Sequence, residues 1–408
     1  MAWKRGIVVP IPKTNPPQVE KMRTVTLLSA PSKIMEKLVL RSMIRKIDPY
    51  LGGSQHAYRR GLSTSTALLH IHDAATRIYD DLQNTGLAIL SLDFTKAFDK
   101  VDHFILLQKI FQNFPSGFGW WLKDYLKNRT FRVKIQGKLS QEHETNVGVP
   151  QGSVLGPVLF SILVADLPPM NTVNTFVQYA DDVNIIMPLN ASDSREIKQK
   201  VLDQIMEVEN WCVRNKQNLN KEKTKLMTYM RSGTSEDDFG PVSKEKTLKI
   251  LGVTMNEALT WGDHIETVVK RAGKRLYILR TVKPYVSTHE LHQVYIALIR
   301  SLCDYCCPVF VNLPQTLVKR IQKIEKRAHK IVYGDSMDCA CVLDGCVARR
   351  FDLSKEFFLK ILRDEQHPLH DRLPKMLPHN NRFANFTCRT DKRLNSFFPY
   401  VTLLMNRR

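Results

Sequence analysis

Three aspartates are the residues of this chain best suited to metal-assisted chemistry. Asp93 follows a short apolar run over 87–92, and the pair Asp181-Asp182 interrupts a β-rich segment over 176–187. Carboxylate oxygens are hard ligands of the kind that Mg²⁺ prefers, with water and substrate phosphates completing its shell. Two such ions about 3.5–4 Å apart can activate an attacking hydroxyl and stabilise the leaving oxygen of a phosphoryl transfer.

Each aspartate also has a purely structural interpretation. An Asp at the end of a strand is commonly a turn or cap residue, and Asp-Asp is common at the tip of a hairpin. Taken singly, each of the three aspartates fits the turn interpretation better. Their neighbours and their order along the chain must therefore decide between the two.

Hydrophobic periodicity places these aspartates on a mixed α and β body. The run over 87–92 predicts a buried strand that ends at Asp93, and 176–187 predicts a hairpin with Asp181-Asp182 at its tip. Side by side, these strands would gather the three carboxylates at one edge of a sheet. Further strands are predicted over 131–136, 225–230 and 247–253, and helices over 32–47, 64–82, 103–113, 118–127, 157–166 and 197–211.

The sequence also predicts how the first helix begins, where the mixed body ends and how the tail is built. The helix over 32–47 is expected to have Ser32 as its N-cap and a buried side formed by Ile34, Leu38, Met43 and Ile47. A boundary near 258–262 separates the mixed body from a helical, basic part. The tail beyond residue 365 contains several prolines, and we expect it to be irregular.

The composition favours a polyanionic partner. The 408 residues include 60 Lys+Arg against 40 Asp+Glu, a net charge of +20, which favours nucleic acid before a membrane surface. Eight cysteines are too sparse for a secreted disulfide scaffold. The longest uncharged run, over 145–165, contains proline and glycine, unlike a membrane helix. We expect a nuclear or cytoplasmic protein that is not secreted and has no membrane partner.

Three sequence blocks, in order, carry a resemblance to a known family. They are Leu92-Asp93-Phe94-Thr95-Lys96-Ala97-Phe98-Asp99, then Gly148-Val149-Pro150-Gln151-Gly152-Ser153-Val154-Leu155-Gly156-Pro157, then Tyr179-Ala180-Asp181-Asp182. The chain resembles the reverse transcriptases of non-LTR (LINE-type) retrotransposons from about Trp3 to Arg350. Single tetrads arise by chance, but three blocks in this order and spacing are hard to explain otherwise.

The resemblance implies an α+β fold, the right-hand polymerase. It would have fingers over 1–86, a palm with an antiparallel sheet over 87–258 that contains a helical insertion at about 103–146, and a helical thumb and C-terminal extension over 259–408. The implied activity is that of an RNA-directed DNA polymerase, which transfers nucleotides from dNTPs to a primer 3′-OH on an RNA template. An RNA–DNA duplex and dNTPs are therefore the expected partners.

The resemblance also implies residue roles. Asp93, Asp181 and Asp182 would be catalytic and would hold two Mg²⁺ ions, with Mn²⁺ as a possible substitute. The resemblance places Phe94, Phe98 and Gln151 at the nucleotide. Candidates for contact with its triphosphate are Arg23, Lys13 and Lys223. Phe98 corresponds to a bulky gate under the sugar, although simple core packing also explains a Phe there. In so basic a chain, any single Lys is more often a solvated surface residue than a ligand of phosphate.

The template and primer would contact a third set of residues. These are Pro150, Gly152, Arg59, Leu251, Gly252, Lys270 and Lys274. A glycine at 152 would let the backbone approach the nucleotide closely, and Leu251-Gly252 match the primer-gripping turn of the family. The basic residues of the C-terminal helices, Lys270 and Lys274 among them, would track phosphates or would simply be solvated.

Cysteines and histidines outside these blocks have structural interpretations. The spacing of Cys339, Cys341 and Cys346 fits no zinc knuckle, and Cys303, Cys306 and Cys307 are expected to pack inside the protein. We expect structural thiols in both places. His289 and His292, one helical turn apart, lack an acidic partner pattern and receive the same interpretation.

The resemblance begins inside the fingers region. Neither the helical extension that precedes it in the family nor an endonuclease domain has a counterpart in the sequence. We therefore expect a truncated chain with uncovered apolar surface and poor solubility, and a possible separate chain bearing the endonuclease. Besides an active polymerase, two alternatives stay open: a catalytically silent nucleic-acid-binding relic, and a truncated retrotransposon fragment that folds poorly.

Overall fold

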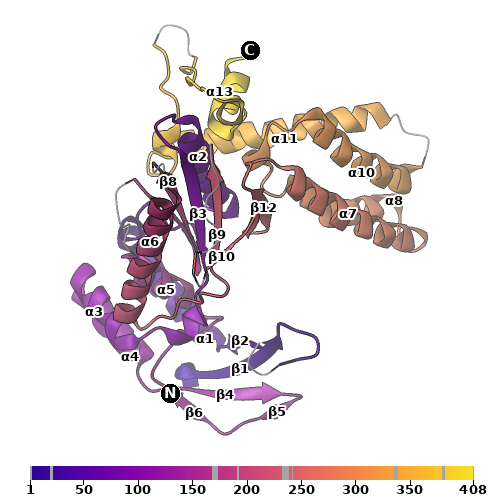
Figure 1. The fold of residues 1–408 in the computed structure, drawn as a ribbon. Helices are drawn as coiled ribbons and strands as arrows, with labels where there is room; N and C mark the ends of the chain where they lie inside the picture. The colour runs from indigo at the N-terminus through magenta and orange to yellow at the C-terminus, as the bar shows by residue number, and fades with distance from the viewer. Residues whose placement is uncertain are drawn as a thin grey trace.

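The computed structural model describes residues 2–18, 22–167, 173–190, 193–231, 239–240, 242–334, 339–378 and 382–407, with side chains of the helix over 339–362 described from residue 347. The described chain is an α+β protein with a central sheet, helices on both of its faces, a second sheet near the N-terminus and a helical arm (Figure 1). The N-terminus and the C-terminus lie at opposite ends of the molecule in this view.

The central sheet has the strand order β10-β9-β3-β8-β7. Its strands are β3 (Gly86–Leu92), β7 (Thr175–Tyr179), β8 (Asp182–Leu189), β9 (Lys225–Met230) and β10 (Ser243–Lys244). The middle strand β3 is antiparallel to both β8 and β9. Its side chains alternate between two cores, with Ala88 and Leu90 in one and Leu87 and Ile89 in the other. This period of two is what a strand covered on both faces requires.

Helices from the first half of the chain cover one face of the central sheet. They are α1 (Ala30–Tyr50), α3 (His103–Asn113), α4 (Ser116–Leu126), α5 (Gly156–Val164) and α6 (Ser194–Asn215). All five contribute buried side chains to the core that contains Leu90. The predicted helix over 103–113 is confirmed by α3, and the predicted hairpin over 176–187 is confirmed by β7 and β8.

The other face of the central sheet is covered by α2 (Thr64–Asp80) and by the C-terminal part of the chain. Residues 66–76 of α2 are all buried, because α12 (Asp391–Leu394) and α13 (Phe397–Asn406) pack against α2 in addition to the sheet. A buried ion pair joins the two regions, with Arg393 Nη1 2.6 Å from Asp73 Oδ1. The helix α11 (Cys339–Leu362) also packs against α13.

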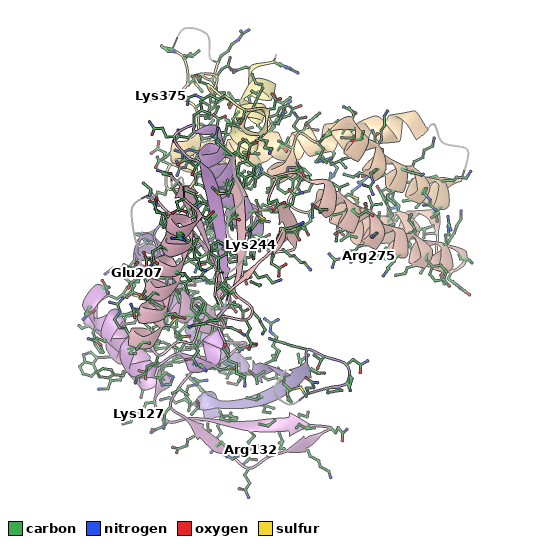
Figure 2. The ribbon with its side chains drawn as sticks, in the orientation of Figure 1. Lys127, Arg132, Glu207, Lys244, Arg275 and Lys375 are labelled. Atoms are coloured by element: carbon green, nitrogen blue, oxygen red, sulfur yellow. The ribbon has the colours of Figure 1, made fainter. Side chains whose placement is uncertain are left out.

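The second sheet forms one end of the molecule. It contains β1 (Arg5–Pro12), β2 (Met22–Leu27), β4 (Arg129–Ile135), β5 (Lys138–Leu139) and β6 (His143–Thr145), with β1 antiparallel to β2 and parallel to β4. Figure 2 shows Arg132 on this sheet, at a distance from the arm that carries Arg275. The predicted strand over 131–136 is confirmed by β4.

A helical arm projects from the body (Figure 1). It is built from α7 (Gly262–Val282), α8 (Thr288–Tyr295) and α10 (Gln315–Tyr333), which share a core of their own. A π-helical turn over Ile296–Arg300 and the short α9 (Ser301–Asp304) lead from α8 back to the body. Arg275 of α7 donates a hydrogen bond to the Leu298 carbonyl at 2.5 Å and so ties α7 to that turn.

Three sequence expectations differ from the structure. The strand predicted over 247–253 is a hairpin of β11 (Thr247–Ile250) and β12 (Val253–Asn256), because Leu251 and Gly252 adopt positive φ between them. The tail beyond residue 365 is not irregular throughout, since Phe397, Phe398 and Val401 of α13 are almost fully buried. Pro399 lies in the first turn of α13, where its missing N–H removes no intrahelical hydrogen bond.

The expected cap and buried side of the first helix are also corrected. Ser29, not Ser32, is the N-cap of α1, and its side chain accepts from the Ser32 N–H. Ile34 and Leu38 are more than half exposed, whereas Met43 and Ile47 are buried. At 100° per residue, Leu38 and Met43 lie about 140° apart on the helix and cannot share one narrow face.

Among the described residues, none of the helices has the length and apolar character needed to cross a membrane.

Candidate active site

Asp93 and Asp182 lie at the same end of the central sheet. The antiparallel β3–β8 pairing ends with Leu92 opposite Val183, and Asp93 and Asp182 are the next residues of the two segments beyond that pair. Asp181 precedes Asp182 at the tip of the β7–β8 hairpin, near enough to Asp93 for the two charges to interact. The structure thus brings together the three predicted carboxylates.

The loop before α2 holds the tip of this hairpin. Ala180 has a φ of 59°, a left-handed conformation that is uncommon for a residue with a side chain. The side-chain oxygen of the fully buried Gln55 accepts hydrogen bonds from the backbone N–H of Ala180 at 3.1 Å and of Ala57 at 3.0 Å. Gln55 therefore fixes the backbone from which Asp181 projects.

The charge of Asp93 disfavours the ionisation of Asp181 and Asp182. Burial is the largest cause that raises the pKa of Asp181, and the charge of Asp93 adds to it, against a backbone hydrogen bond and the positive charges of Arg23 and Lys13. Burial, followed by the charges of Asp181 and Asp93, raises the pKa of Asp182 to about 6. A cation placed between these groups would relieve the repulsion and favour the ionised forms.

The donor set fits Mg²⁺ in an open site. Within the described ranges, no group of three or more His, Cys, Asp or Glu side chains is arranged to hold a metal ion. Mg²⁺, however, is usually bound through one or two carboxylates and keeps waters and substrate phosphates for the rest of its shell. Clustered carboxylates with raised pKa values supply the oxygen ligands and the negative charge that such a site requires.

Three predicted phosphate-binding cations lie beside the carboxylates. Lys223 Nζ is 3.9 Å from Asp93 Oδ2, and both side chains are exposed. Arg23 on β2 and Lys13 in the segment after β1 lie close enough to Asp181 to lower its pKa. The second sheet therefore contributes positive charge to the end of the central sheet that carries the aspartates.

The turn before α5 contacts the second sheet through its backbone. Thr26 donates its N–H to the Gln151 carbonyl at 2.7 Å, and Gly152 has a φ of 128°. A β-carbon on Gly152 would lie 2.4 Å from the Thr26 carbonyl oxygen. We expected a nucleotide to be the close neighbour of this glycine, and the structure shows the backbone of β2 there. The Gln151 side chain donates to Asp99 Oδ1 at 3.0 Å.

A buried carboxylate on α1 positions the same turn. Glu36 Oε2 accepts hydrogen bonds from the N–H groups of Val154 at 2.6 Å and Leu155 at 3.1 Å. Its other oxygen accepts from the Tyr125 hydroxyl at 3.1 Å, and burial raises the pKa of that hydroxyl. The buried role of Glu36 is not predictable from the sequence, because a lone Glu in an amphipathic helix usually faces solvent. The Pro150 carbonyl accepts from Ser153 within the same turn.

The two phenylalanines of the first block have different environments. The Phe94 side chain is 6% exposed and lies edge-on to Trp211, so only its backbone can face the site. Phe98 is half-buried, with its ring centroid 4.7 Å from that of Phe160. Both the gate and the packing interpretation of Phe98 are compatible with this position.

Arg59 has a structural role that differs from the predicted template contact. Its guanidinium forms an ion pair with Asp48 at 3.3 Å and donates to the backbone carbonyls of Asp48, Gly52 and Gln55. The side chain is 12% exposed. Its donors are thus used to join the end of α1 to the loop that contains Gln55.

Leu251 and Gly252 form the turn between β11 and β12, and a turn at these two residues is what the resemblance implies. The Leu251 carbonyl accepts a hydrogen bond from the Tyr305 hydroxyl at 2.7 Å, and the same ring lies 3.5 Å from where a β-carbon on Gly252 would be. Lys270 and Lys274 lie on the exposed side of α7, where Lys270 forms an ion pair with Glu266 at 3.4 Å. Both lysines are therefore accessible to solvent on the helical arm.

The remaining expectations concern cysteines and histidines. Cys303, Cys306 and Cys307 are buried free thiols, as predicted, although only Cys303 lies in a regular α-helix. The side chains of Cys339, Cys341 and Cys346 lie outside the described residues. His292 bonds to the Tyr333 hydroxyl at 2.8 Å inside the arm, which is consistent with a structural role.

Tyr58 is a further residue of the site that sequence analysis did not single out. It is 54% exposed and adopts a φ of 58° in the loop before α2. Burial raises the pKa of its hydroxyl, the charge of Asp181 raises it further, and Arg23 opposes both. Its place beside an acidic and a basic residue of the site depends on the loop conformation, which sequence periodicity does not reveal.

Comparison with known proteins gives the family. The family model described as reverse transcriptase (RNA-dependent DNA polymerase) matches residues 11–255, a range that includes all three aspartates. A probable RNA-directed DNA polymerase from the Drosophila melanogaster transposon BS is 27% identical over 85% of this chain and 40% of its own length. The corresponding protein of the X-element from the same organism is 26% identical over 97% of this chain and 44% of its length.

The chain thus spans less than half of the length of these two curated relatives. Among solved structures, telomerase from Candida albicans with a fragment of telomeric RNA matches with 13% identity and a TM-score of 0.47, over 90% of this chain and 60% of that chain. Apo telomerase from Candida tropicalis matches with 12% identity and a TM-score of 0.46, over 90% and 62% of the two chains.

Proposed function

The chain belongs to the reverse transcriptase family, with the right-hand polymerase fold, and from that premise we propose that it is an RNA-directed DNA polymerase of a non-LTR retrotransposon. It would transfer nucleotides from dNTPs to a primer 3′-OH on an RNA template. The observation that carries the proposal is that Asp93, at the end of β3, lies close enough to Asp181 and Asp182 on the neighbouring hairpin for the three charges to interact. Local turn chemistry explains each aspartate singly, but it does not explain why all three meet beside several cations.

The three aspartates would hold two Mg²⁺ ions, with Mn²⁺ as a substitute. When bound, the ions would stabilise the charge that develops on the transferred phosphoryl group and favour ionisation of the attacking hydroxyl. Lys223, Arg23 and Lys13 would bind oxygens of the incoming triphosphate, Arg as a two-pronged donor and Lys as a point charge. Because Arg23 is on the second sheet, that sheet would act as the fingers over the triphosphate.

The nucleotide and its template would be positioned by the turn over 150–157 and by Phe98. The Gln151–Asp99 hydrogen bond and the contacts of Glu36 make that turn rigid, which supports a role in aligning a base pair. The Phe98 ring would exclude a ribose 2′-OH. The exposed lysines of α7 would contact phosphates of the RNA–DNA duplex, with affinity that falls as salt rises.

The same proposal includes a cellular location for the protein and a further protein partner. A nuclear or cytoplasmic location agrees with the buried free cysteines, and an endonuclease-bearing chain would act separately on the target. The alternative is a nucleic-acid-binding relic without catalysis.

Primer extension tests the proposal, with an RNA template, an annealed DNA primer, four dNTPs and Mg²⁺ or a chelator. Mg²⁺-dependent extension supports the polymerase. Salt-sensitive binding of the duplex without extension, by a cooperatively folded chain, supports the relic.

A further inference from the structure

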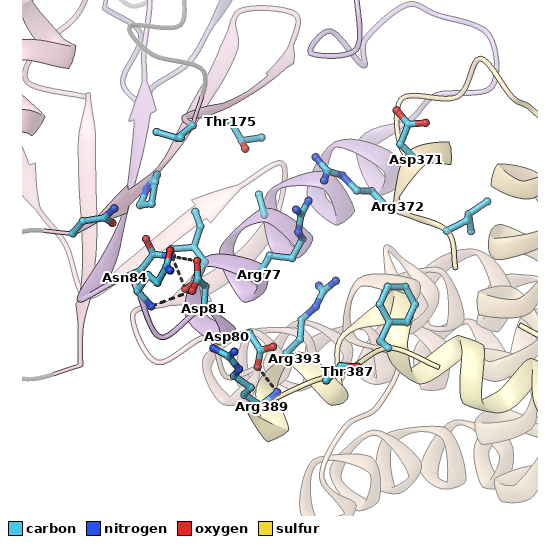
Figure 3. A pocket seen from close by; sticks show the side chains of 18 residues that line it. Arg77, Asp80, Asp81, Asn84, Thr175, Asp371, Arg372, Thr387, Arg389 and Arg393 are labelled. Carbon is cyan, nitrogen blue, oxygen red and sulfur yellow. Dashed lines mark hydrogen bonds between the residues drawn. The ribbon is translucent and has the colours of Figure 1, made fainter. Parts of the chain in front are cut away.

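A cavity of about 1030 Å³ lies at the opposite end of the central sheet from the aspartates (Figure 3). It is bounded by the C-terminal turns of α2, by the β7 and β8 ends that carry Thr175 and Pro188, and by the segment between α11 and α12. The strand β3 has seven residues, so the two ends of the sheet are roughly 20 Å apart. The cavity is therefore separate from the candidate active site.

Four arginines line this cavity. Arg393 is buried in its ion pair with Asp73, and Arg372 Nε is 3.9 Å from the other oxygen of the same carboxylate. Arg77 and Arg389 are exposed, and no hydrogen bond or ion pair joins their guanidinium groups to another residue of the described ranges. Figure 3 shows Arg77, Arg372 and Arg393 directed toward the same space. Asp73 balances part of the charge of Arg372 and Arg393, so Arg77 and Arg389 are the guanidinium groups that can bind a further anion.

No ion pair within the described residues joins the three aspartates that line the cavity to Arg77 or Arg389. Asp80 Oδ1 accepts hydrogen bonds from the backbone N–H groups of Arg389 at 2.9 Å and Thr390 at 2.7 Å. The Asp81 oxygens accept from Gln83 and Asn84 at 3.0 and 3.2 Å. Figure 3 shows the carboxylate of Asp371 turned away from the guanidinium groups of Arg77 and Arg372. The guanidinium groups of Arg77 and Arg389 are thus available to an anionic ligand.

An aromatic ring completes the lining. Phe386 borders the cavity, half-buried, with the Arg393 guanidinium 5.8 Å from its ring centroid. Arginine forks that bind phosphate, beside a ring that can stack on a base, are the features by which proteins recognise unpaired nucleotides. The volume is at the upper end of the usual range for ligand pockets, enough for a few nucleotides but not for a duplex.

We propose that this cavity binds a segment of single-stranded nucleic acid, with phosphates at Arg77, Arg372 and Arg389 and a base against Phe386. In a template-directed polymerase such a site would hold a strand outside the duplex. The proposal does not depend on catalysis, because it requires only binding at a distance from Asp93. It assigns a function to arginines that neither the family resemblance nor the candidate site uses.

The test is fluorescence anisotropy with labelled oligo(U) and oligo(dT) of about 12 nucleotides, which separates RNA from DNA as the ligand. Excess unlabelled RNA–DNA duplex keeps the primer-template site occupied. The variant Arg77→Gln/Arg389→Gln should bind at least one of the two oligonucleotides about tenfold or more weakly, as expected for two lost charge-assisted contacts. The control Arg41→Gln/Arg45→Gln removes the same charge from exposed positions on α1 and should change affinity less than about twofold.

A second variant tests the base contact. Phe386→Leu keeps apolar volume but removes the stacking surface, and should weaken binding about fivefold or more, with cooperative thermal unfolding retained. Equal affinity for the Arg77/Arg389 variant and the Arg41/Arg45 control, or no binding of either oligonucleotide by the wild type, would overturn the proposal. So would arginine-dependent binding of an acidic peptide with no binding of oligonucleotide. Primer extension is measured separately, so a failed polymerase and a failed cavity proposal give different results.

Discussion

The α-carbon of Gly152 lies against the carbonyl of Thr26, so closely that a β-carbon at 152 would be 2.4 Å from that oxygen. The contact joins the turn before α5 to β2 of the second sheet, next to the hydrogen bond from the Thr26 N–H to the Gln151 carbonyl. The candidate active site therefore depends on a backbone-to-backbone junction between two sheets. The fold itself therefore requires glycine at position 152, whether or not a nucleotide lies nearby.

Gly152→Ala should destabilise the protein by about 2 kcal/mol or more, because it adds both a clash and an unfavourable φ. Denaturant unfolding measures the change. Gly117→Ala is the control, since Gly117 lies in α4 with open space around it and no positive φ. Alanine there should be neutral or stabilising by up to about 1 kcal/mol. A Gly152→Ala protein as stable as the wild type would contradict the junction.

Glu36→Ala should destabilise the protein by about 2–4 kcal/mol, because it leaves the Val154 and Leu155 N–H groups and the Tyr125 hydroxyl without their acceptor. The measurement is the free energy of unfolding in urea. Glu222→Ala, at an exposed position, is the matched control and should change it by less than about 0.5 kcal/mol. Similar small effects of both substitutions would show that the Glu36 carboxylate does not hold the turn.

Asp182→Asn should stabilise the metal-free protein more at pH 7.5 than at pH 5. The folded-state pKa of Asp182, about 6, exceeds the usual value for Asp, so the folded state binds this proton more tightly than the unfolded state does. Wild-type stability is therefore lost as the pH rises toward and through 6. The gain from the substitution at pH 7.5 is about 1 kcal/mol, reduced from the full linkage value because the side chain is solvent-accessible.

This pH effect is measured by urea unfolding of both proteins in chelator. Mg²⁺ should then stabilise the wild type more than the variant, since it relieves the repulsion among the carboxylates. A stability difference that does not change between pH 5 and 7.5 would contradict the raised pKa.

Phe98→Val should increase ribonucleotide incorporation relative to deoxyribonucleotide incorporation by about tenfold or more, if the ring excludes a 2′-OH. Steady-state extension with each class of nucleotide measures the ratio. Phe160→Leu alters the same ring contact from the other side and should leave the ratio unchanged. If both variants change the ratio equally, or neither does, the Phe98 ring acts in packing rather than as a gate.

The sequence alone was sufficient for the strand before Asp93 and for the hairpin that carries Asp181 and Asp182, because both lie in short apolar runs bounded by polar residues. It did not give the β3–β8 register, which depends on long-range pairing. The same limit explains why the buried contacts of Glu36 and Arg59 could not be predicted from the sequence. A charged residue acquires buried partners only when distant elements meet, as α1 meets the turn over 150–157.

Local patterns also misled at two places. Ile34 and Leu38 are apolar but exposed, because the buried stripe of α1 follows Glu36, Met43 and Ile47 instead. The prolines of the C-terminal tail predict irregular structure, yet α13 forms there and packs against α2. Arg393 and Asp73 form their buried pair across that contact, and a separation of 320 residues hides such a partnership from any local pattern.

The central claim is that Asp93, Asp181 and Asp182 form a metal-dependent polymerase site, and primer extension by an Asp181→Asn/Asp182→Asn variant tests it most directly. The wild type should extend a DNA primer on an RNA template with dNTPs and Mg²⁺. The variant should fold, bind the duplex and extend no primer, because the ligands that position the ions are lost. Equal extension by the two proteins would contradict the assignment of these carboxylates.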